Sequence, residues 1–195
     1  MKKTGILILA ISLISMGFNF KNQSIKDAPL KVDITKSTIH WSGYKPTGSH
    51  TGTVELQAGT ISLDGNKITG GNFTVDMHSI KDSDGSEKLE KHLKSKDFFE
   101  VAVFPTATFE LTHTANKNGK TYITGNLTVK NNTKQITFPA SISVTDSSIT
   151  LTSEVFKINR ADFNVRYKSK SFFNNLKEKF INDEFDLQVK IVANL

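Results

Sequence analysis

Apolar and polar residues alternate along most of the chain from residue 30 onward. Every second position in a series of short segments is apolar, and polar side chains fill the positions between them. The clearest segments are residues 73–77, 109–111, 127–129, 136–138, 142–144, 149–151 and 185–191. A repeat of two residues predicts β-strands with one buried face and one face in water.

Turn-forming stretches separate these segments at short intervals. They are LDGN at 63–66, TGGN at 69–72, NKNGK at 116–120, KNNTK at 130–134 and TDSS at 145–148. Short turns between alternating strands predict antiparallel hairpins rather than crossover helices. With further strands expected near residues 32–41, 51–56 and 61–69, the sheet has about eight or nine strands. The uniform one-faced pattern favours a closed barrel over a sandwich, because closure leaves no strand edge unpaired.

Two segments break the alternation. Residues 85–99 place Leu89 and Leu93 four positions apart, with Ser86 as a candidate N-cap, and therefore predict a short helix. Residues 169–180 have aromatic and aliphatic side chains at helical spacing, which indicates a second short helix or a loop. Both segments are rich in aromatic residues and lysine, as expected of elements that cap a barrel mouth.

The stretch from Asp97 to Phe104 is too aromatic for a solvent loop. We interpret it as an ordered connection that packs aromatic side chains onto the barrel and ends at Pro105, before the sheet resumes. Two roles remain open for Phe98 and Phe99. They either plug one end of the barrel as core residues or contact a ligand.

An apolar run over residues 5–16 follows two lysines near the N-terminus. This layout predicts a secretory signal peptide over residues 1–20, cleaved after Gly17, with the folded domain at 30–195. An uncleaved anchor is the alternative interpretation of the same run. Either way, we expect the domain outside the cytoplasm, in the periplasm or secreted.

Composition narrows the range of functions. The chain has 195 residues and no cysteine, which suits one domain and excludes thiolate metal sites, thiol nucleophiles and a lipid anchor on an N-terminal cysteine. Its formal net charge is +6, but only Arg160 and Arg166 are arginine, which argues against recognition of nucleic acid. Lysines gather at 81–96 and at 168–179. These lysines form a solvated face or make transient contact with an anionic membrane surface.

Catalytic motifs are missing from the sequence. Its histidines show no spacing typical of metal ligands; they are His40, His50, His78, His92 and His113. No Gly-x-Ser-x-Gly elbow occurs, and Asp76, Glu110 and Asp186 fall on the polar phase of their strands. Arg160 suits a structural pairing with Asp162 or another carboxylate better than contact with a ligand headgroup. We therefore expect no enzyme, no metal site and no cofactor.

Three stretches resemble the YceI-like family of secreted, lipocalin-like proteins. They are HLKSKDFFEVAVFPTATFEL at 92–111, ITGNLTVKNNTKQITFP at 123–139 and INRADFNV at 158–165. The resemblance covers roughly residues 31–194. It implies an all-β fold, an extended antiparallel eight-stranded lipocalin-like barrel with one or two short helices at the mouth. It also implies an apolar lumen that binds an isoprenoid-type or other long-chain amphiphilic lipid, without catalytic apparatus.

The sequence departs from the family pattern at Asn132 and Asn164, where glycine is common, and residues 166–180 form a mouth specific to this branch. The apolar phase does not tell a hollow barrel from a packed one, because both present the same alternation. A packed barrel that binds an envelope protein, and an enzyme acting on a bound lipid, are therefore the alternatives to a lipid carrier. The residues predicted to line the lumen are Trp41, Phe73, Val75, Phe98, Phe99, Phe109, Leu127 and Phe138.

Overall fold

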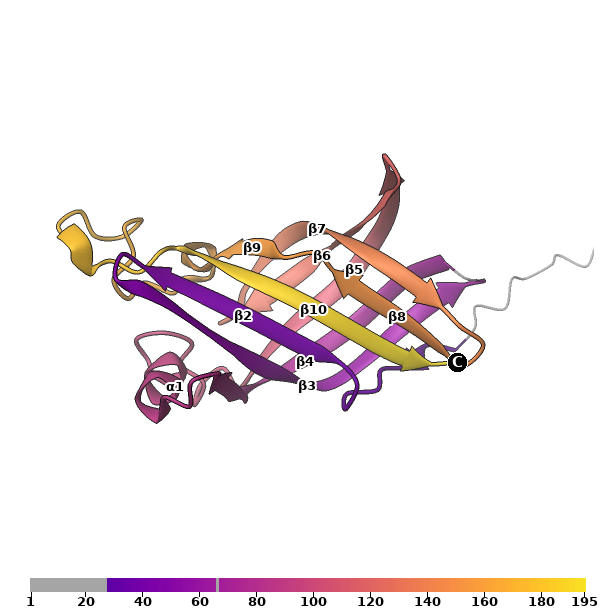
Figure 1. Cartoon of the computed structure of the whole chain (residues 1–195), viewed down its shortest axis with the longest axis horizontal. Helices are drawn as coiled ribbons and strands as arrows, with labels where there is room; N and C mark the ends of the chain where they lie inside the picture. The colour runs from indigo at the N-terminus through magenta and orange to yellow at the C-terminus, as the bar shows by residue number, and fades with distance from the viewer. Residues whose placement is uncertain (1–27, 66) are drawn as a thin grey trace, which may run out of the picture.

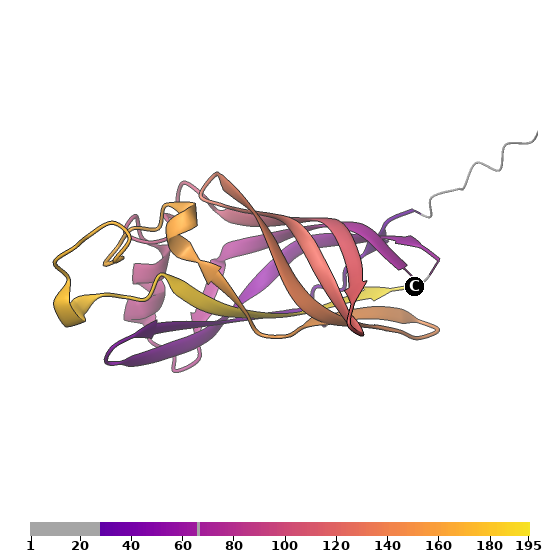
Figure 2. The same cartoon turned by 90° about the horizontal axis from the view of Figure 1, so that it is seen from above.

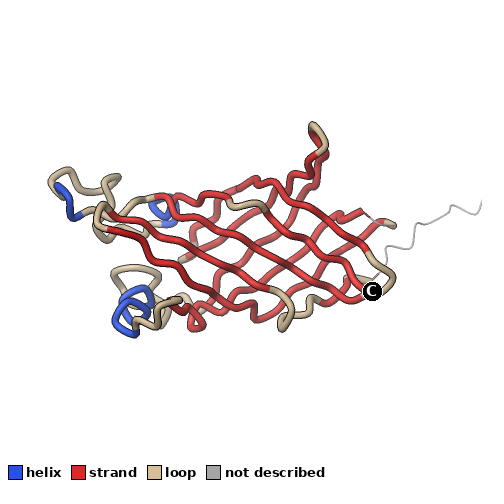
Figure 3. Tube along the Cα trace, viewed as in Figure 1, coloured by secondary structure: helices blue, strands red, loops and turns tan. Residues whose placement is uncertain are grey.

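The computed structural model of the chain describes residues 28–65 and 67–195, and strands dominate it (Figure 3). The predicted signal peptide lies outside the described residues. The strands are β1 (Leu30–Lys31), β2 (Thr38–Lys45), β3 (Gly48–Asp64), β4 (Lys67–Asp82), β5 (Thr106–Lys117), β6 (Lys120–Val129), β7 (Asn132–Val144), β8 (Ser148–Ser153), β9 (Phe156–Asn159) and β10 (Glu184–Asn194). The helical elements are α1 (Glu87–Lys94) and the 3₁₀ turns η1 (Arg160–Phe163) and η2 (Lys177–Lys179).

Eight long strands close into an antiparallel barrel (Figures 1 and 2). Their order is β3-β2-β10-β8-β7-β6-β5-β4, and β4 pairs back onto β3. The two short strands β1 and β9 pair with β3 and β10 respectively. The predicted eight-stranded, lipocalin-like barrel is therefore confirmed.

Two hairpins show why the turn residues were informative. Asn118 and Gly119 join β5 to β6, and Lys130 and Asn131 join β6 to β7, with positive φ at all four positions. Two-residue turns of this kind match the right-handed twist of the flanking strands, and asparagine and glycine adopt positive φ at low cost. The turn predicted at residues 69–72 is wrong, because these residues lie inside β4.

Gly71 explains that error. A Cβ at this position would lie 2.8 Å from the carbonyl oxygen of Thr60 and about 3.0 Å from the ring of Phe73. The glycine therefore allows close approach of neighbouring groups within a strand rather than a turn. Local sequence cannot separate these two uses of glycine.

The strand expected at residues 32–41 is interrupted by a turn between β1 and β2. The carboxylate of Asp33 accepts hydrogen bonds from the backbone N–H groups of Thr35 and Lys36, which closes the turn. Hydrogen bonds from Thr35 and Lys36 lower the pKa of Asp33 to about 2. The strands expected at 51–56 and 61–69 also differ from the structure, since the first belongs to β3 and the second spans the β3–β4 hairpin.

The helix predicted after residue 85 is confirmed as α1. The hydroxyl of Ser86 caps it by accepting a hydrogen bond from the N–H of Leu89 at 3.4 Å. Residues 169–180 form a loop with only the short turn η2. Both α1 and this loop lie at the end of the barrel opposite the C-terminus (Figure 1).

Among the helices of the described chain, none combines the length and apolar character that a membrane crossing needs.

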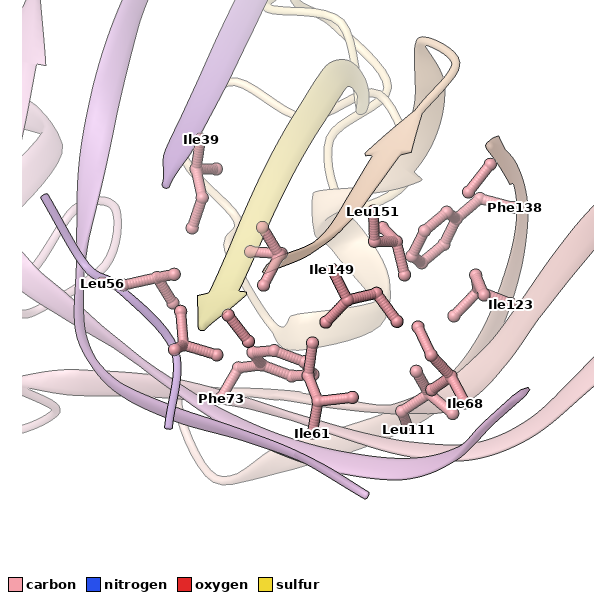
Figure 4. Close-up of a cluster of buried hydrophobic side chains, with 14 residues drawn as sticks. Ile39, Leu56, Ile61, Ile68, Phe73, Leu111, Ile123, Phe138, Ile149 and Leu151 are labelled. Carbon is pink, nitrogen blue, oxygen red and sulfur yellow. The ribbon is translucent and has the colours of Figure 1, made fainter. Parts of the chain in front are cut away.

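Fully buried apolar side chains fill the end of the barrel nearest the C-terminus. Ile61, Ile68, Ile149 and Ala193 have no solvent exposure, and none of them borders a cavity. They belong to a cluster of 14 buried apolar residues, whose side chains converge in Figure 4. Packing at this density fixes the closed end of the barrel.

The wall contains a seam between β7 and β9. Both β8 and β9 pair with β10, but β7 pairs only with β8 on that side, from Ala140 to Val144. Within the described chain, residues 132–138 of β7 pair through the backbone with β6 alone, whereas the carbonyl oxygen of Pro139 also accepts a hydrogen bond from the N–H of Glu154. Across the seam, the rings of Phe138 and Phe156 stack with centroids 4.2 Å apart and planes 8° from parallel.

Candidate functional site

The barrel encloses a cavity of about 750 Å³ that runs from the α1 side along most of β10, as far as Ile191. Its walls are the inward apolar side chains of the long strands, and residues of α1 and of the loop between η1 and β10 border it at the opening. All eight residues predicted from the sequence border it: Trp41, Phe73, Val75, Phe98, Phe99, Phe109, Leu127 and Phe138. The structure thus brings the predicted residues together around one space. Their contact with a ligand stays a prediction.

A row of aromatic rings crosses the wall of the cavity. The ring centroids of Phe73 and Phe109 lie 6.2 Å apart, and those of Phe109 and Phe138 lie 5.8 Å apart. The row continues to Phe156 through the stack across the seam. Gly125 makes room for it, because a Cβ there would collide with the ring of Phe109. Tilted rings at these separations attract one another and give the wall a stiff apolar surface.

A second aromatic group lies where α1 meets the cavity. His92 makes edge contacts with Phe98 and with Tyr167, with centroids 5.0 Å and 4.6 Å apart. Phe98 is buried, borders the cavity and packs against Phe99. Phe98 is therefore a buried residue at this end of the barrel that also faces the cavity, and its contact with a ligand stays a prediction.

Residues 164–183, called the mouth segment below, form the other side of the opening. Arg160 fixes the base of this segment. Its guanidinium has 4% of its surface exposed and lies 3.3 Å from a carboxylate oxygen of Asp183. It also donates to three backbone carbonyl oxygens, each at 3.0 Å, those of Val165, Ile181 and Asn182. Burial lowers the pKa of Arg160, and the charge of Asp183 opposes that effect.

The carboxylate that pairs with Arg160 is thus Asp183 rather than the exposed Asp162. Asp183 lies 23 positions further along the chain, a separation that no local motif reveals. The mouth segment also supplies Tyr167, Phe180 and Ile181 to the cavity wall. Sequence analysis missed these three because the segment has no alternation. It also left out residues of the alternating strands that could have been found, such as those of β10.

Charge around the opening is mostly positive. Lys45, Lys88, Lys168 and Lys179 border the cavity. Glu178 is the one carboxylate among the described residues of its wall. The carboxylates considered for catalysis, Asp76, Glu110 and Asp186, do not border it. The cavity is therefore apolar at depth and cationic at its rim.

Asp186 instead takes part in a surface contact near the opening. The hydroxyl of Tyr44 donates to its carboxylate at 2.7 Å, and Lys157 lies 3.2 Å away. The hydrogen bond raises the pKa of Tyr44 and lowers the pKa of Asp186. These contacts join β2 to β10 beside the rim.

One group of side chains could hold a metal ion among the described residues. Ligand atoms of His50, Asp82 and Asp84 all lie within 4.8 Å of one another. No metal site was expected from the sequence, because these residues do not form a recognisable spacing motif. His50 also borders the cavity.

A sequence model of the YceI-like domain matches residues 30–193. The UPF0312 protein of Shewanella denitrificans is 36% identical over 83 residues, which cover 42% of this chain and 44% of that protein. The chain thus spans less than half the length of the curated relatives it matches.

Two solved structures share the barrel. Burkholderia cenocepacia BcnA has a TM-score of 0.69 at 23% identity, covering 83% of this chain and 99% of that one. A polyisoprenoid binding domain from Saccharophagus degradans has a TM-score of 0.64 at 14% identity, covering 84% and 97% respectively. At these identities, the likeness shows the fold.

Proposed function

Because the chain belongs to the YceI-like family, we propose that it binds a long isoprenoid or similar amphiphilic lipid in its barrel and carries or sequesters it. The observation that carries this proposal is the cavity of about 750 Å³, walled by apolar side chains and rimmed by polar ones. A molecule with an apolar chain and a polar head matches that distribution. The polyisoprenoid binding domain with the same fold supports this class of ligand.

The chain of the ligand would lie along the aromatic row, with its head toward the rim. Burying three isoprene units, about 15 carbons at about 0.8 kcal/mol each, gives a favourable transfer free energy on the order of 12 kcal/mol. Association costs about 4–15 kcal/mol, so a chain this short binds weakly unless the cavity is preorganised. The stiff aromatic wall supplies preorganisation, and a longer prenyl chain adds buried surface.

We infer a binding protein rather than an enzyme from the same wall. A reaction on the bound lipid needs an acid, base or nucleophile that reaches into the cavity. Glu178 and the histidines and lysines that border the cavity lie around its opening, whereas the deeper described wall residues are apolar. This distribution favours binding over chemistry at depth.

Native mass spectrometry of the protein purified from its exporting cells tests the proposal. We expect a noncovalent hydrophobic adduct, which solvent extraction should release as a long-chain prenyl lipid. We also propose that the domain works in the periplasm or is secreted after a signal peptide of about 17–28 residues is removed. The mass of the protein in the same spectrum tests this removal. A protein without adduct that cannot be loaded with polyprenyl lipids would refute lipid carriage, and an intact Met1 in the exported form would refute cleavage.

We also propose that the mouth segment contacts an anionic membrane surface. Phe172 and Phe173 at its tip are 38% and 50% exposed. The carbonyl oxygen of Ser169 accepts hydrogen bonds from both of their N–H groups, so a built turn presents the two rings to solvent. Exposed rings beside cations are typical of proteins that bind at a membrane interface.

The lysines of the segment carry positive charges that no carboxylate pairs with among the described residues, although Lys168 and Lys170 lie over the rings of Tyr167 and Phe180. Among the ion pairs of the described chain, none includes Lys168, Lys170, Lys177 or Lys179. The guanidinium of Arg166 lies 4.8 Å from the ring centroid of Phe172, which places a charge directly beside an exposed ring. A bilayer bound to this segment would lie at the opening of the cavity, where a lipid enters.

Changing these four lysines to glutamine should weaken binding to vesicles that contain phosphatidylglycerol by roughly 100-fold or more, since each charge contributes about 1 kcal/mol. Changing Phe172 and Phe173 to serine should weaken binding without altering its salt dependence. Vesicle flotation at two salt concentrations measures both effects. Lys67→Gln with Lys117→Gln, and exposed Val155→Ser, are the matched controls away from the segment. Equal flotation of all variants would contradict membrane contact while leaving lumen binding intact.

A further inference from the structure

We propose that His50, Asp82 and Asp84 form a site for a divalent transition-metal ion, with zinc as the reference ion, at the rim of the cavity. The proposal is independent of lipid binding. His50 lies near the start of β3, Asp82 is the last residue of β4, and Asp84 lies in the turn before α1. All three ligand atoms are within 4.8 Å of one another.

Strand pairing brings these residues together. The register of β3 and β4 places Gly52 opposite Asp82, so the end of β4 lies beside the start of β3. The N–H of Ser83 then donates to the carbonyl oxygen of Thr51 at 2.9 Å, which holds the following turn against β3. Gly85, with φ of +72°, lets the chain reverse into α1.

Two buried polar atoms face each other in this group without a hydrogen bond. The side chain of Asp82 has no exposed surface, and only its Oδ2 is satisfied, by the N–H of Ser86 at 3.0 Å. Its Oδ1 and the Nδ1 of His50 are both screened from solvent and unpartnered, 3.6 Å apart. That separation is too long for a good hydrogen bond.

A buried carboxylate oxygen without a partner is costly, and native proteins rarely leave one unsatisfied. A cation between the two atoms would satisfy both. Ligands of a tetrahedral zinc ion lie about 3.4 Å apart, given bonds of about 2.0–2.2 Å. The separation of 3.6 Å already matches this geometry.

The donor set selects the class of ion. One imidazole nitrogen and two carboxylates suit zinc and its neighbours in the first transition row, whereas magnesium and calcium prefer oxygen ligands alone. Asp84 is exposed, so its carboxylate can adjust to complete the set. Three protein ligands leave a fourth position open.

Isothermal titration of the tag-free, EDTA-treated protein with zinc chloride tests the site. We expect one zinc ion per chain and a rise in melting temperature with zinc, because an ion that binds only the folded state stabilises it. Calcium chloride should produce neither effect. His50→Ala should abolish binding, and Asp84→Asn should weaken it at least 10-fold.

Asp84→Asn is the decisive variant because its side chain is exposed, so the fold does not depend on it. His113→Ala and Asp76→Asn remove the same chemical groups elsewhere and should leave zinc affinity unchanged. The proposal fails if the wild-type protein does not bind zinc, which would show that His50 and Asp82 simply pair with each other. It also fails if the site variants bind zinc as tightly as the wild type.

Discussion

Replacing Phe109 with aspartate is expected to abolish the lipid adduct while the barrel remains folded. Phe109 lies at the centre of the aromatic row, between Phe73 and Phe138, and borders the cavity. A carboxylate there would have to lose its water against an apolar chain, a cost of several kcal/mol or more. The adduct should therefore fall below detection in native mass spectra.

The fold should survive because one side of the Phe109 ring faces the cavity rather than packed atoms. Truncating a fully buried phenylalanine lowers the free energy of unfolding by about 3–5 kcal/mol. Phe109 is only half-buried, so its loss should lower the free energy of unfolding by less. Circular dichroism should still report a β-sheet. The cavity also lets water reach the new carboxylate when no lipid is present.

Thr108→Asp is the matched control for this prediction. Thr108 is the exposed neighbour of Phe109 on β5, so the substitution adds the same charge to the outer face. Phe109→Leu is a second control, because it changes the same residue but keeps the cavity wall apolar. Both variants should keep the adduct. If Phe109→Asp retained the same adduct, the lipid would have to lie elsewhere than against this wall.

Replacing Arg160 with methionine should lower the free energy of unfolding by about 3–5 kcal/mol, the typical cost of removing one partner of a buried ion pair. The change leaves Asp183 without its cation and removes donors from three backbone carbonyl oxygens. Urea denaturation measures the loss. Amide hydrogen exchange should become faster first in the mouth segment, because the guanidinium of Arg160 holds the base of that segment.

Arg166→Met is the control, since the only other arginine is exposed and bonds to the nearby side chain of Asn164. It should change stability by less than about 0.5 kcal/mol. Arg160→Lys keeps the charge but not the fork of donors, so its loss should be intermediate. Equal stability of Arg160→Met and wild type would contradict the structural role of Arg160.

Acid adds a second test of the same pair. Burial alone raises the pKa of Asp183, but hydrogen bonds from Ser169 and Ser171, together with the charge of Arg160, outweigh it and hold the pKa below its ordinary 3.8. A lowered pKa means that this stabilisation is present above pH 3.8 and is lost as the pH falls through the folded value. Without Arg160, the loss should begin at a higher pH.

Most of the barrel could be predicted because its signals are local. Alternation marks which side chains face inward, and pairs such as Lys130 and Asn131 fix hairpin turns within a few residues. The same inward phase located the strand residues of the apolar wall, whereas Phe98 and Phe99 were predicted from the aromatic stretch before Pro105, and all eight border the cavity. Errors arose where one residue type serves two purposes, as with Gly71.

The opening could not be predicted in the same way. Arg160 and Asp183 meet only after the chain has returned from the mouth segment, and His50 reaches Asp82 only through the pairing of β3 with β4. Such contacts depend on three-dimensional closure, which alternation does not encode. The long-range contacts of Arg160 and His50 therefore emerged from the structure alone, whereas Phe98 and Phe99 were expected at this end from the sequence.

The seam between β7 and β9 makes the circumference of the barrel adjustable. A barrel in which every strand is hydrogen-bonded to both neighbours along its length has a fixed circumference, since widening it breaks several backbone hydrogen bonds at once. Here the stacked rings of Phe138 and Phe156 span the junction, and separating such a pair costs only about 0.5–1.5 kcal/mol beyond its buried area. Residues 132–138, which the backbone ties to β6 alone, can thus move outward while Pro139 stays bonded to Glu154. If the barrel binds a long-chain lipid, as proposed above, such movement would let it accept chains of different thickness.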